Sequence, residues 1–354
     1  MIILAVVIGL IILVIAHEFG HFIASKAFGV KVEEFGVGYP PKLFGKKFGE
    51  TLYSVNLLPL GGFVRIHGEE EHAEEGAEPI DPQRSFVHQA IWKRSFILIA
   101  GVVMNLIAGW LIFSGVFMTG SPEHLILGEI DAKSPAAIAG LMRGDVITFA
   151  KLGELELKDP VQIKEFIGAV KRVAGTEVTI EVMREGKTIE TKLTPRITPP
   201  EGEGALGVEL IEMGFVAKPF FAALGAGFVA MASVLWLTIL GFANLFVSLF
   251  VAPSTALQSV AGPVGIFTLA AQTGEMGFVY LAQLIGFISV NLAVLNLIPF
   301  PALDGGRVLF LCIEKIKGSP ISSRTQRIIN GVGFLALLAL MVLVTVHDVG
   351  KISR

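Results

Sequence analysis

The residue types best suited to chemistry lie near the start of the chain, in the stretch AHEFGHFIA at 16–24. His17 and His21 are four positions apart, so on a helix they share one face and can bind the same metal ion. Glu18 lies beside them and can act as a general base toward water at that metal. So short a pattern also arises by chance, but here it interrupts an apolar run, where polar groups need compensation. We therefore predict a metal site in this segment.

A third ligand is expected elsewhere, because catalytic zinc usually takes three protein ligands and leaves one position open. The stretch NLAVLNLIPFPALDGGRVLF at 291–310 offers Asp304, which is the only acid between Glu275 and Glu314. The alternative for Asp304 is a cap or turn residue before the two glycines that follow it. We predict that Asp304 completes the metal site with the two histidines.

Two amide side chains share the apolar run before Asp304. Asn291 and Asn296 lie there, and amides in membrane helices often join neighbouring helices, with about 1 kcal/mol for each contact. A sharper hypothesis is that they hydrogen-bond the backbone of a substrate. The residues alone leave both interpretations open.

The composition points to a membrane protein. Of the 354 residues, 53% are hydrophobic and only 17% are charged, which is too apolar for an ordinary soluble chain of this length. The formal net charge of -3 argues against nucleic acid as a partner. Cys312 is the only cysteine, which excludes an intrachain disulfide and a cysteine-rich zinc site.

Four apolar stretches are each close to the ~20 residues that a helix needs to cross a bilayer core. The predicted transmembrane helices lie within residues 1–26, 94–120, 276–306 and 328–347. The first lacks the basic start and small-residue cleavage site of a signal peptide, so we expect it to be retained. The fold class is a polytopic α-helical membrane protein with about four transmembrane helices, a membrane-associated β-sheet region and an inserted, mostly-β domain.

Two polar regions separate these helices. Region 27–93 contains short alternating runs (VKVEEF, TLYSVNL, GGFVRI) that predict strands, and its acidic stretch at 68–79 is typical of a solvated loop. Region 121–197 contains the strand-like runs LILGEI, DVITFA, TEVTIEVM and KTIETKLT and one helical run, DPVQIKEFIGAVKRV. We therefore predict a small, mostly-β domain there, followed by a linker, PPEGEG, at 199–204.

Lysine and arginine counts predict the orientation. Regions 27–93 and 307–327 are rich in basic residues, so both should be cytoplasmic, with 121–197 and both chain termini outside. An odd number of crossings must then join 121–197 to 307–327, and the helix within 276–306 already supplies one. We therefore expect 205–275 to be an interfacial or re-entrant helical segment, with a plain fifth transmembrane helix as the alternative.

These motifs together resemble the site-2 protease family of intramembrane zinc metalloproteases, and most closely the bacterial branch typified by the regulator of sigma E protease. The resemblance is carried by HEFGH at 17–21, NxxPxPxLDGG at 296–306 and GPVGI at 262–266, and it covers essentially the whole chain. It implies one catalytic Zn²⁺ bound by His17, His21 and Asp304, with Glu18 as the base. It also implies that Asn291 and Asn296 hold the substrate.

The resemblance further implies a membrane-embedded β-hairpin or loop that pairs with an extended substrate. LPLGGFVRIHG at 58–68 occupies that place, which makes Gly61, Gly62, Phe63 and Val64 candidate substrate-binding residues. Cleavage needs an extended strand, because a helix hides its peptide bonds, and an edge strand can hold one by β-augmentation. The alternative is an ordinary interfacial strand.

The domain at 121–197 resembles a PDZ domain, which implies a peptide ligand or a gate that excludes bulky substrates. The sequence carries one such domain, where the sigma E branch carries two, so the arrangement that filters substrates there does not transfer directly.

We predict a zinc-dependent intramembrane endopeptidase, located as a multi-pass protein in the inner (cytoplasmic) membrane. Its partners would be the lipid bilayer and single-span membrane proteins, which it cleaves in regulated intramembrane proteolysis, with anti-sigma factors or remnant signal peptides as substrates. A metal or proton transporter is the rival hypothesis, since intramembrane histidine and aspartate also mark ion pathways. A catalytically inactive adaptor with a PDZ domain is a third.

Overall fold

The chain forms two compact units. The computed structural model describes residues 2–69, 81–158, 161–184, 186–200, 202–251, 262–275 and 277–352. The first unit, called the helical unit, comprises Met1–Ser114, Leu224–Gly274 and Tyr280–Arg354, and the second, called the β unit, comprises Gly115–Ala223 and Glu275–Val279. Most of the predicted acidic loop and part of the predicted linker lie outside the described residues.

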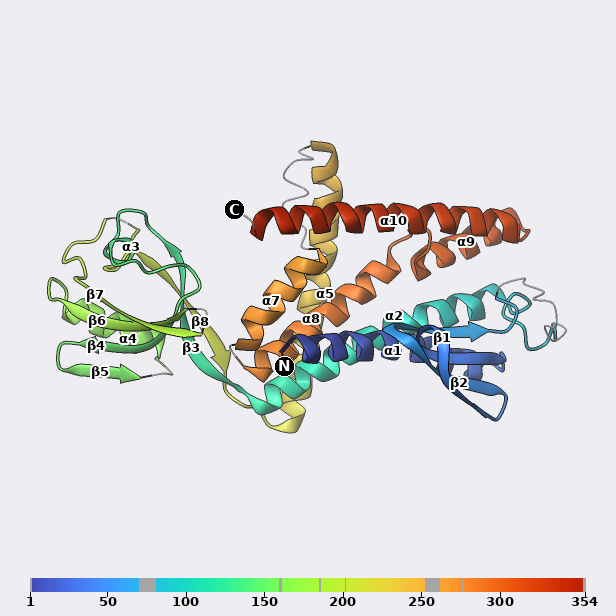
Figure 1. The fold of residues 1–354 in the computed structure, drawn as a ribbon, viewed down its shortest axis with the longest axis horizontal. Helices are drawn as coiled ribbons and strands as arrows, with labels where there is room; N and C mark the ends of the chain where they lie inside the picture. Colours follow the sequence, from blue (N-terminus) through green and yellow to red (C-terminus); the bar gives the residue numbers. More distant parts are fainter. Residues whose placement is uncertain are drawn as a thin grey trace. The chain divides into compact units, whose positions relative to one another are not determined.

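The helical unit is built mainly from helices (Figure 1). They are α1 (Ile2–Ala27), α2 (Ile91–Thr119), α5 (Phe220–Val251), α7 (Pro263–Glu275), α8 (Phe278–Leu297), α9 (Asp304–Lys317) and α10 (Ser323–Ile352). In the described part of the chain, five helices are long and apolar enough to cross a membrane: α1, α2, α5, α8 and α10. α5 is the candidate beyond the four predicted crossings, so the number of helices that cross the membrane stays a prediction.

A stripe of small and apolar residues brings α1 close to its neighbours. The buried positions of α1 recur every three or four residues, as one face of a helix requires. A Cβ atom added at Gly20 would lie 2.3 Å from the carbonyl oxygen of Ala100 on α2, and one at Gly9 would lie 2.7 Å from Ile285 on α8. Glycine therefore permits the close helix contacts that are typical of membrane proteins.

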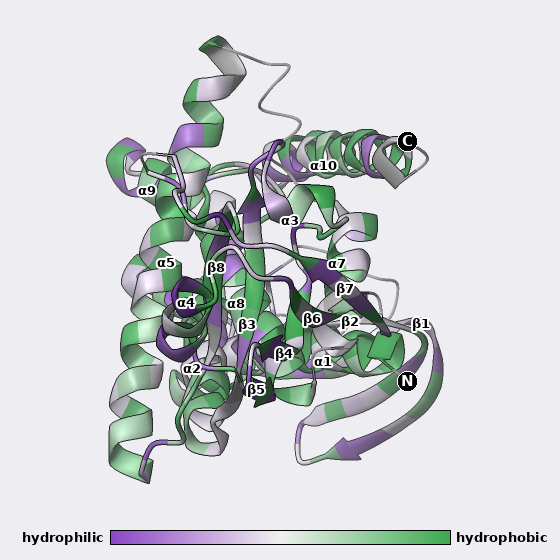
Figure 2. Ribbon diagram, turned by 90° about the vertical axis from the view of Figure 1, so that its left-hand side faces the viewer, coloured by the Kyte–Doolittle hydropathy of each residue, from purple (hydrophilic) through white to green (hydrophobic). Residues whose placement is uncertain are grey.

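The predicted re-entrant segment contains a long, uninterrupted helix, α5. α5 runs from Phe220 to Val251 without a break, so a path that turns back within this range is excluded. Figure 1 shows α5 running crosswise to α10, and Figure 2, turned by 90°, shows α5 along its length and largely hydrophobic. Hydropathy alone does not predict this direction, because it measures how apolar a segment is and not which neighbours it packs on.

A small sheet packs against α1. It consists of β1 (Val32–Phe48) and β2 (Thr51–Ile66). The β structure predicted for the three runs in region 27–93 is confirmed, but the second and third runs belong to one strand, β2. The register places four segments side by side in the order 42–48, 51–56, 32–37 and 62–66. Among the described residues, segment 62–66 is paired on one side only, so it is an edge of the sheet. The ring of Phe22 on α1 lies 5.5 Å from the ring of Phe35, which fixes the sheet on the helix.

In its described residues, the β unit contains a six-stranded sheet with strand order β7-β6-β4-β3-β8, and β5 pairs with β4. The strands are β3 (Ser121–Ile130), β4 (Val146–Leu152), β5 (Leu155–Lys158), β6 (Val178–Arg184), β7 (Lys187–Leu193) and β8 (Val208–Phe215), with helices α3 (Pro135–Ile138) and α4 (Ile163–Arg172). The four predicted strands and the predicted helix are confirmed. Phe166 of α4 is fully buried against the apolar side chains of the sheet, so this unit has its own core.

The predicted end of this domain at residue 197 is wrong. β8 pairs antiparallel with β3, placing Ile211 opposite Ile126 and Leu210 opposite Leu127. The predicted helical segment at 205–275 therefore begins with a strand of the β unit. The cause is a pairing between segments about 80 residues apart, which local sequence patterns do not reveal.

Candidate metal centre

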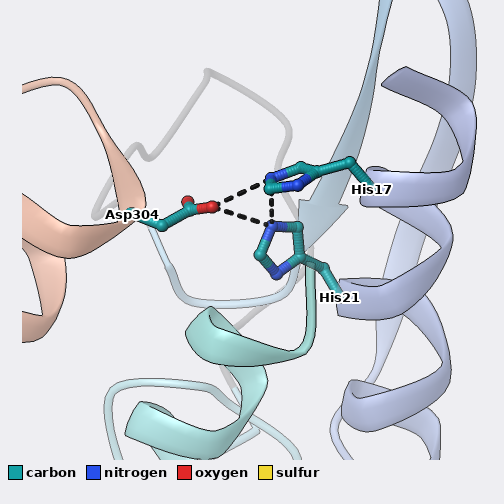
Figure 3. Close-up of side chains that lie close together, drawn as sticks. All are labelled: His17, His21 and Asp304. Carbon is teal, nitrogen blue, oxygen red and sulfur yellow. Dashed lines mark hydrogen bonds and ion pairs between the residues drawn. The ribbon is translucent and has the colours of Figure 1, made fainter. Parts of the chain in front are cut away.

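Two turns of α1 present the histidines on one face. His17 and His21 are both buried, and their Nε2 atoms lie 3.2 Å apart. Figure 3 shows both rings reaching from α1 toward Asp304 on another segment of the chain. The spacing of four residues produces this arrangement because successive turns of a helix stack such side chains.

Asp304 is the first residue of α9, and the two glycines after it explain how it reaches α1. A Cβ atom at Gly305 would lie 2.3 Å from the carbonyl oxygen of Leu297, and one at Gly306 would lie 2.2 Å from that of Phe300. Side chains at these positions would therefore push α9 away from the end of α8. The start of a helix also favours a carboxylate, through the helix dipole.

The three predicted ligands come together. The Asp304 Oδ2 atom lies 2.9 Å from His17 Nε2 and 3.4 Å from His21 Nε2. In the described part of the chain, these three residues form the one group of histidine, cysteine and acidic side chains placed to hold a metal ion. A tetrahedral zinc with ligand bonds of about 2.1 Å separates its ligand atoms by about 3.4 Å, so the observed triangle fits zinc.

Helix α2 supplies the surroundings of both imidazoles, which the sequence analysis missed. The Nδ1 atom of His21 lies 2.8 Å from the carbonyl oxygen of Ile97, and the Nδ1 atom of His17 lies 3.3 Å from the Asn105 amide. A Cβ atom at Gly101 would lie 2.5 Å from His21 Nε2 and 2.8 Å from His17 Cε1. A lone asparagine in the apolar run of α2 was the available signal, since polar groups in such helices are costly unless paired.

A cavity of about 640 Å³ opens beside the triangle. Its lining includes His17, Glu18, His21, Gly62, Phe63, Val64, Asn296 and Asp304. A Cβ atom at Gly62 would lie 3.5 Å from Glu18 Cγ, so the edge segment 62–66 runs directly beside this carboxylate. Gly61 is not among the lining residues. It has a φ of +115°, and a Cβ atom there would lie 2.7 Å from the Tyr39 ring. The structure thus brings together the metal triangle, an acid and a free strand edge.

The two asparagines of α8 have different surroundings. Asn296 lines the cavity. Asn291 donates a hydrogen bond to the carbonyl oxygen of Phe287 at 2.8 Å and accepts one from the Thr238 hydroxyl of α5 at 3.3 Å. The contact with Thr238 is the helix-joining role that the sequence left open for Asn291, and substrate binding by Asn291 stays a prediction.

Two polar pairs also line the cavity. Arg307, one turn after Asp304, pairs with Glu69 beyond the end of β2 at 2.5 Å. His67 pairs with Glu33 at 2.6 Å. The Arg307–Glu69 pair joins α9 to the edge segment, so it restrains the two walls of the cavity. Local sequence patterns do not reveal pairs between residues so far apart in the chain.

Comparisons with known proteins agree with this geometry. The sequence model of peptidase family M50 matches residues 5–340. The chain is similar to the zinc metalloprotease RasP of Shouchella clausii, at 31% identity over 96% of this chain and 97% of the relative. It is also similar to the regulator of sigma-W protease RasP of Bacillus subtilis, at 28% identity over 96% of each chain.

Proposed function

The chain belongs to peptidase family M50, and from this premise we propose that it is a zinc-dependent intramembrane endopeptidase that cuts within membrane-spanning segments of other proteins. One observation carries the proposal. A triangle of two imidazole nitrogens and one carboxylate oxygen lies beside Glu18, in a cavity lined in part by α1, α2 and α8, which are apolar enough to cross a membrane. Such a constellation in an apolar setting needs a functional reason.

The roles of the residues follow from their positions. His17, His21 and Asp304 would hold the zinc ion through the atoms that face one another in Figure 3. When bound, zinc supplies Lewis acidity that polarises the scissile carbonyl and activates water for attack. Glu18 takes a proton from the attacking water and delivers it to the leaving amine nitrogen, which completes hydrolysis of the peptide bond.

The edge of the small sheet is suited to hold the substrate. Segment 62–66 has a free edge beside Glu18, so an extended chain can add to it as a further strand. Gly62, Phe63 and Val64 line the cavity at this edge, and Asn296 faces it from α8. A transmembrane helix that unwinds here would have its peptide bonds exposed next to the metal site.

We place the protein in the cell membrane as a multi-pass protein, supported by the five apolar helices found among the described residues. The basic residues of regions 27–93 and 307–327 favour a cytoplasmic position for both, with the β unit and the chain termini outside. The crosswise course of α5 supports a path other than a regular crossing for this helix (Figure 1). The β unit, with its six strands and two helices, would act as the PDZ-like module and bind peptide ends or restrict access.

The substrates would be single-span membrane proteins processed by regulated intramembrane proteolysis. The printed name of the Bacillus subtilis relative, regulator of sigma-W protease, supports an anti-sigma factor as one substrate type. Remnant signal peptides, which are short apolar helices, would suit the same cavity.

The proposal is tested by incubating the purified full-length chain with a tagged single-span protein in detergent. Wild type should cut inside the apolar segment, as located by mass spectrometry, whereas Glu18→Gln should bind zinc without cutting. Glu156→Gln, which changes an exposed acid of the β unit, is the matched control and should cut like wild type. Cutting by Glu18→Gln at the wild-type rate would refute the mechanism. Zinc flux into proteoliposomes, equal in wild type and Glu18→Gln, would favour the transporter.

A further inference from the structure

We propose that Asn105 is a positioning residue that holds the His17 ring in the tautomer required for metal binding, as part of a stripe on α2 that orients both histidines. The stripe consists of the Ile97 carbonyl, Gly101 and the Asn105 amide, spaced four residues apart on one face of the helix. The inference rests on the proposed function in one respect, that His17 and His21 bind zinc.

The two imidazoles are held in the same way but by different groups. The Nδ1 atom of His21 lies 2.8 Å from the main-chain carbonyl oxygen of Ile97, which accepts and therefore keeps the proton on Nδ1. The Nε2 atom of His21 is then free to face the metal position. A metal-binding histidine generally donates its second ring nitrogen in this manner, which sets both tautomer and ring orientation.

Asn105 is the group placed to do the same for His17. Its side-chain amide lies 3.3 Å from His17 Nδ1, and the residue is 1% exposed. Among the described residues, its amide has no other hydrogen-bond partner, and its Oδ1 atom is buried without one. An unpaired buried amide oxygen is costly, so it needs a donor.

The atom nearest His17 Nδ1 is the amide nitrogen of Asn105, and a rotation of the amide by 180° puts the Oδ1 atom in its place. The Oδ1 atom then accepts the hydrogen bond from Nδ1–H of His17, and the lone pair of His17 Nε2 points to the triangle with Asp304 and His21. In the opposite orientation the amide donates to Nδ1, which places the proton on Nε2, where the metal must bind. Zinc binding therefore selects the orientation that also pairs the buried oxygen.

The packing of α2 on α8 does not depend on this side chain. Ser289 on α8 donates a hydrogen bond to the main-chain oxygen of Asn105 at 2.8 Å, and Gly109 approaches Val290 closely. The Asn105 side chain instead faces α1. Its role is therefore separable by experiment from that of the α2–α8 contact.

The test is the zinc affinity of the purified full-length protein, measured by competition with a chelator of known strength. Asn105→Leu keeps the volume but removes the acceptor, and it should lower the affinity by about 10- to 100-fold. Asn105→Asp keeps an acceptor and should stay close to wild type. Ser289→Ala is the matched control at the same helix contact, and its affinity should not change.

Two results would overturn the inference. One is a zinc affinity of Asn105→Leu equal to that of wild type. The other is a loss of zinc affinity in Asn105→Asp as large as the loss in Asn105→Leu, which is the pattern that a packing role alone predicts. The absorption spectrum of the cobalt-substituted protein, recorded on the folded fraction, gives a second measure, and it should change in Asn105→Leu only. Absence of zinc from the wild type would instead refute the proposed function, so the two failures are distinguishable.

Discussion

Replacing Gly101 by alanine should disable the metal centre by the addition of a single methyl group. Gly101 lies on the face of α2 that meets α1, and a Cβ atom there would lie 2.5 Å from His21 Nε2 and 2.8 Å from His17 Cε1. Favourable contacts between such atoms need about 3.5–4.0 Å. The methyl group therefore overlaps both rings by about 1 Å, and one or both must move away from Asp304.

The expected magnitude has two parts of opposite sign. Alanine is intrinsically better than glycine in a helix by about 1 kcal/mol, so α2 itself should not suffer. Crowding of a packed site costs about 1–3 kcal/mol, but the metal-free protein can relieve it by turning the rings aside. Zinc binding requires the rings in place, so the cost falls on the affinity, which should drop by about 5- to 150-fold.

The assay is again chelator competition, combined with the melting temperature of the metal-free protein. Gly115→Ala is the matched control, because it lies on the same helix and an added Cβ atom meets nothing within 4 Å. The control should bind zinc like wild type and be equally or slightly more stable. The reasoning is refuted if Gly101→Ala binds zinc as tightly as Gly115→Ala.

Three further predictions concern metal, charge and pH. A strong zinc chelator should abolish peptide cleavage, and added zinc should restore it; activity that persists after the metal is removed would contradict the account. Arg94→Leu should lower the free energy of unfolding by about 3–5 kcal/mol, because Arg94 and Glu314 form a buried ion pair at 2.9 Å; a melting temperature equal to wild type would show that the pair is dispensable. A hydrogen bond from Lys26 is the main cause that lowers the pKa of Glu50 from its usual 4.5. Ionised Glu50 therefore stabilises the folded protein above pH 4.5, and this stabilisation is lost as the pH falls through the lowered pKa. Melting temperatures of wild type and Glu50→Gln should therefore differ near neutral pH and converge in acid, and a difference independent of pH would argue against the contact.

The ligands of the metal centre could be predicted from the sequence because their geometry is local. A spacing of four residues places His17 and His21 on one helix face whatever the rest of the fold does. Asp304 could be predicted because acids are so rare in that part of the chain that one candidate was left. The LDGG motif gains a physical reason from the structure, since Gly305 and Gly306 let the start of α9 lie against the backbone that ends α8.

The groups around the ligands could not be predicted in the same way. Which face of α2 meets α1 depends on close packing at Gly20 and Gly101, and hydropathy does not distinguish one face of a uniformly apolar helix from another. Asn105 was visible only as a polar residue in an apolar run. Its distance to His17 results from the tertiary structure.

Two elements show the same limit at the level of the fold. β8 completes a sheet by pairing with β3 across a long stretch of chain, and short alternating runs do not specify such distant partners. For α5, composition predicts a helix of sufficient length, but the crosswise course in Figure 1 depends on its contacts with α2 and α8.

The most direct test of the central claim is a paired measurement of zinc content and peptide cleavage on the same purified samples. Wild type should contain one zinc ion per chain and cut a single-span substrate, Glu18→Gln should contain zinc without cutting, and Asp304→Ala should lose most of its zinc and its activity. Asp131→Ala, at an exposed acid of the β unit, should match wild type in both. If Asp304→Ala keeps its zinc, or if Glu18→Gln cuts as fast as wild type, the assignment of these residues is wrong.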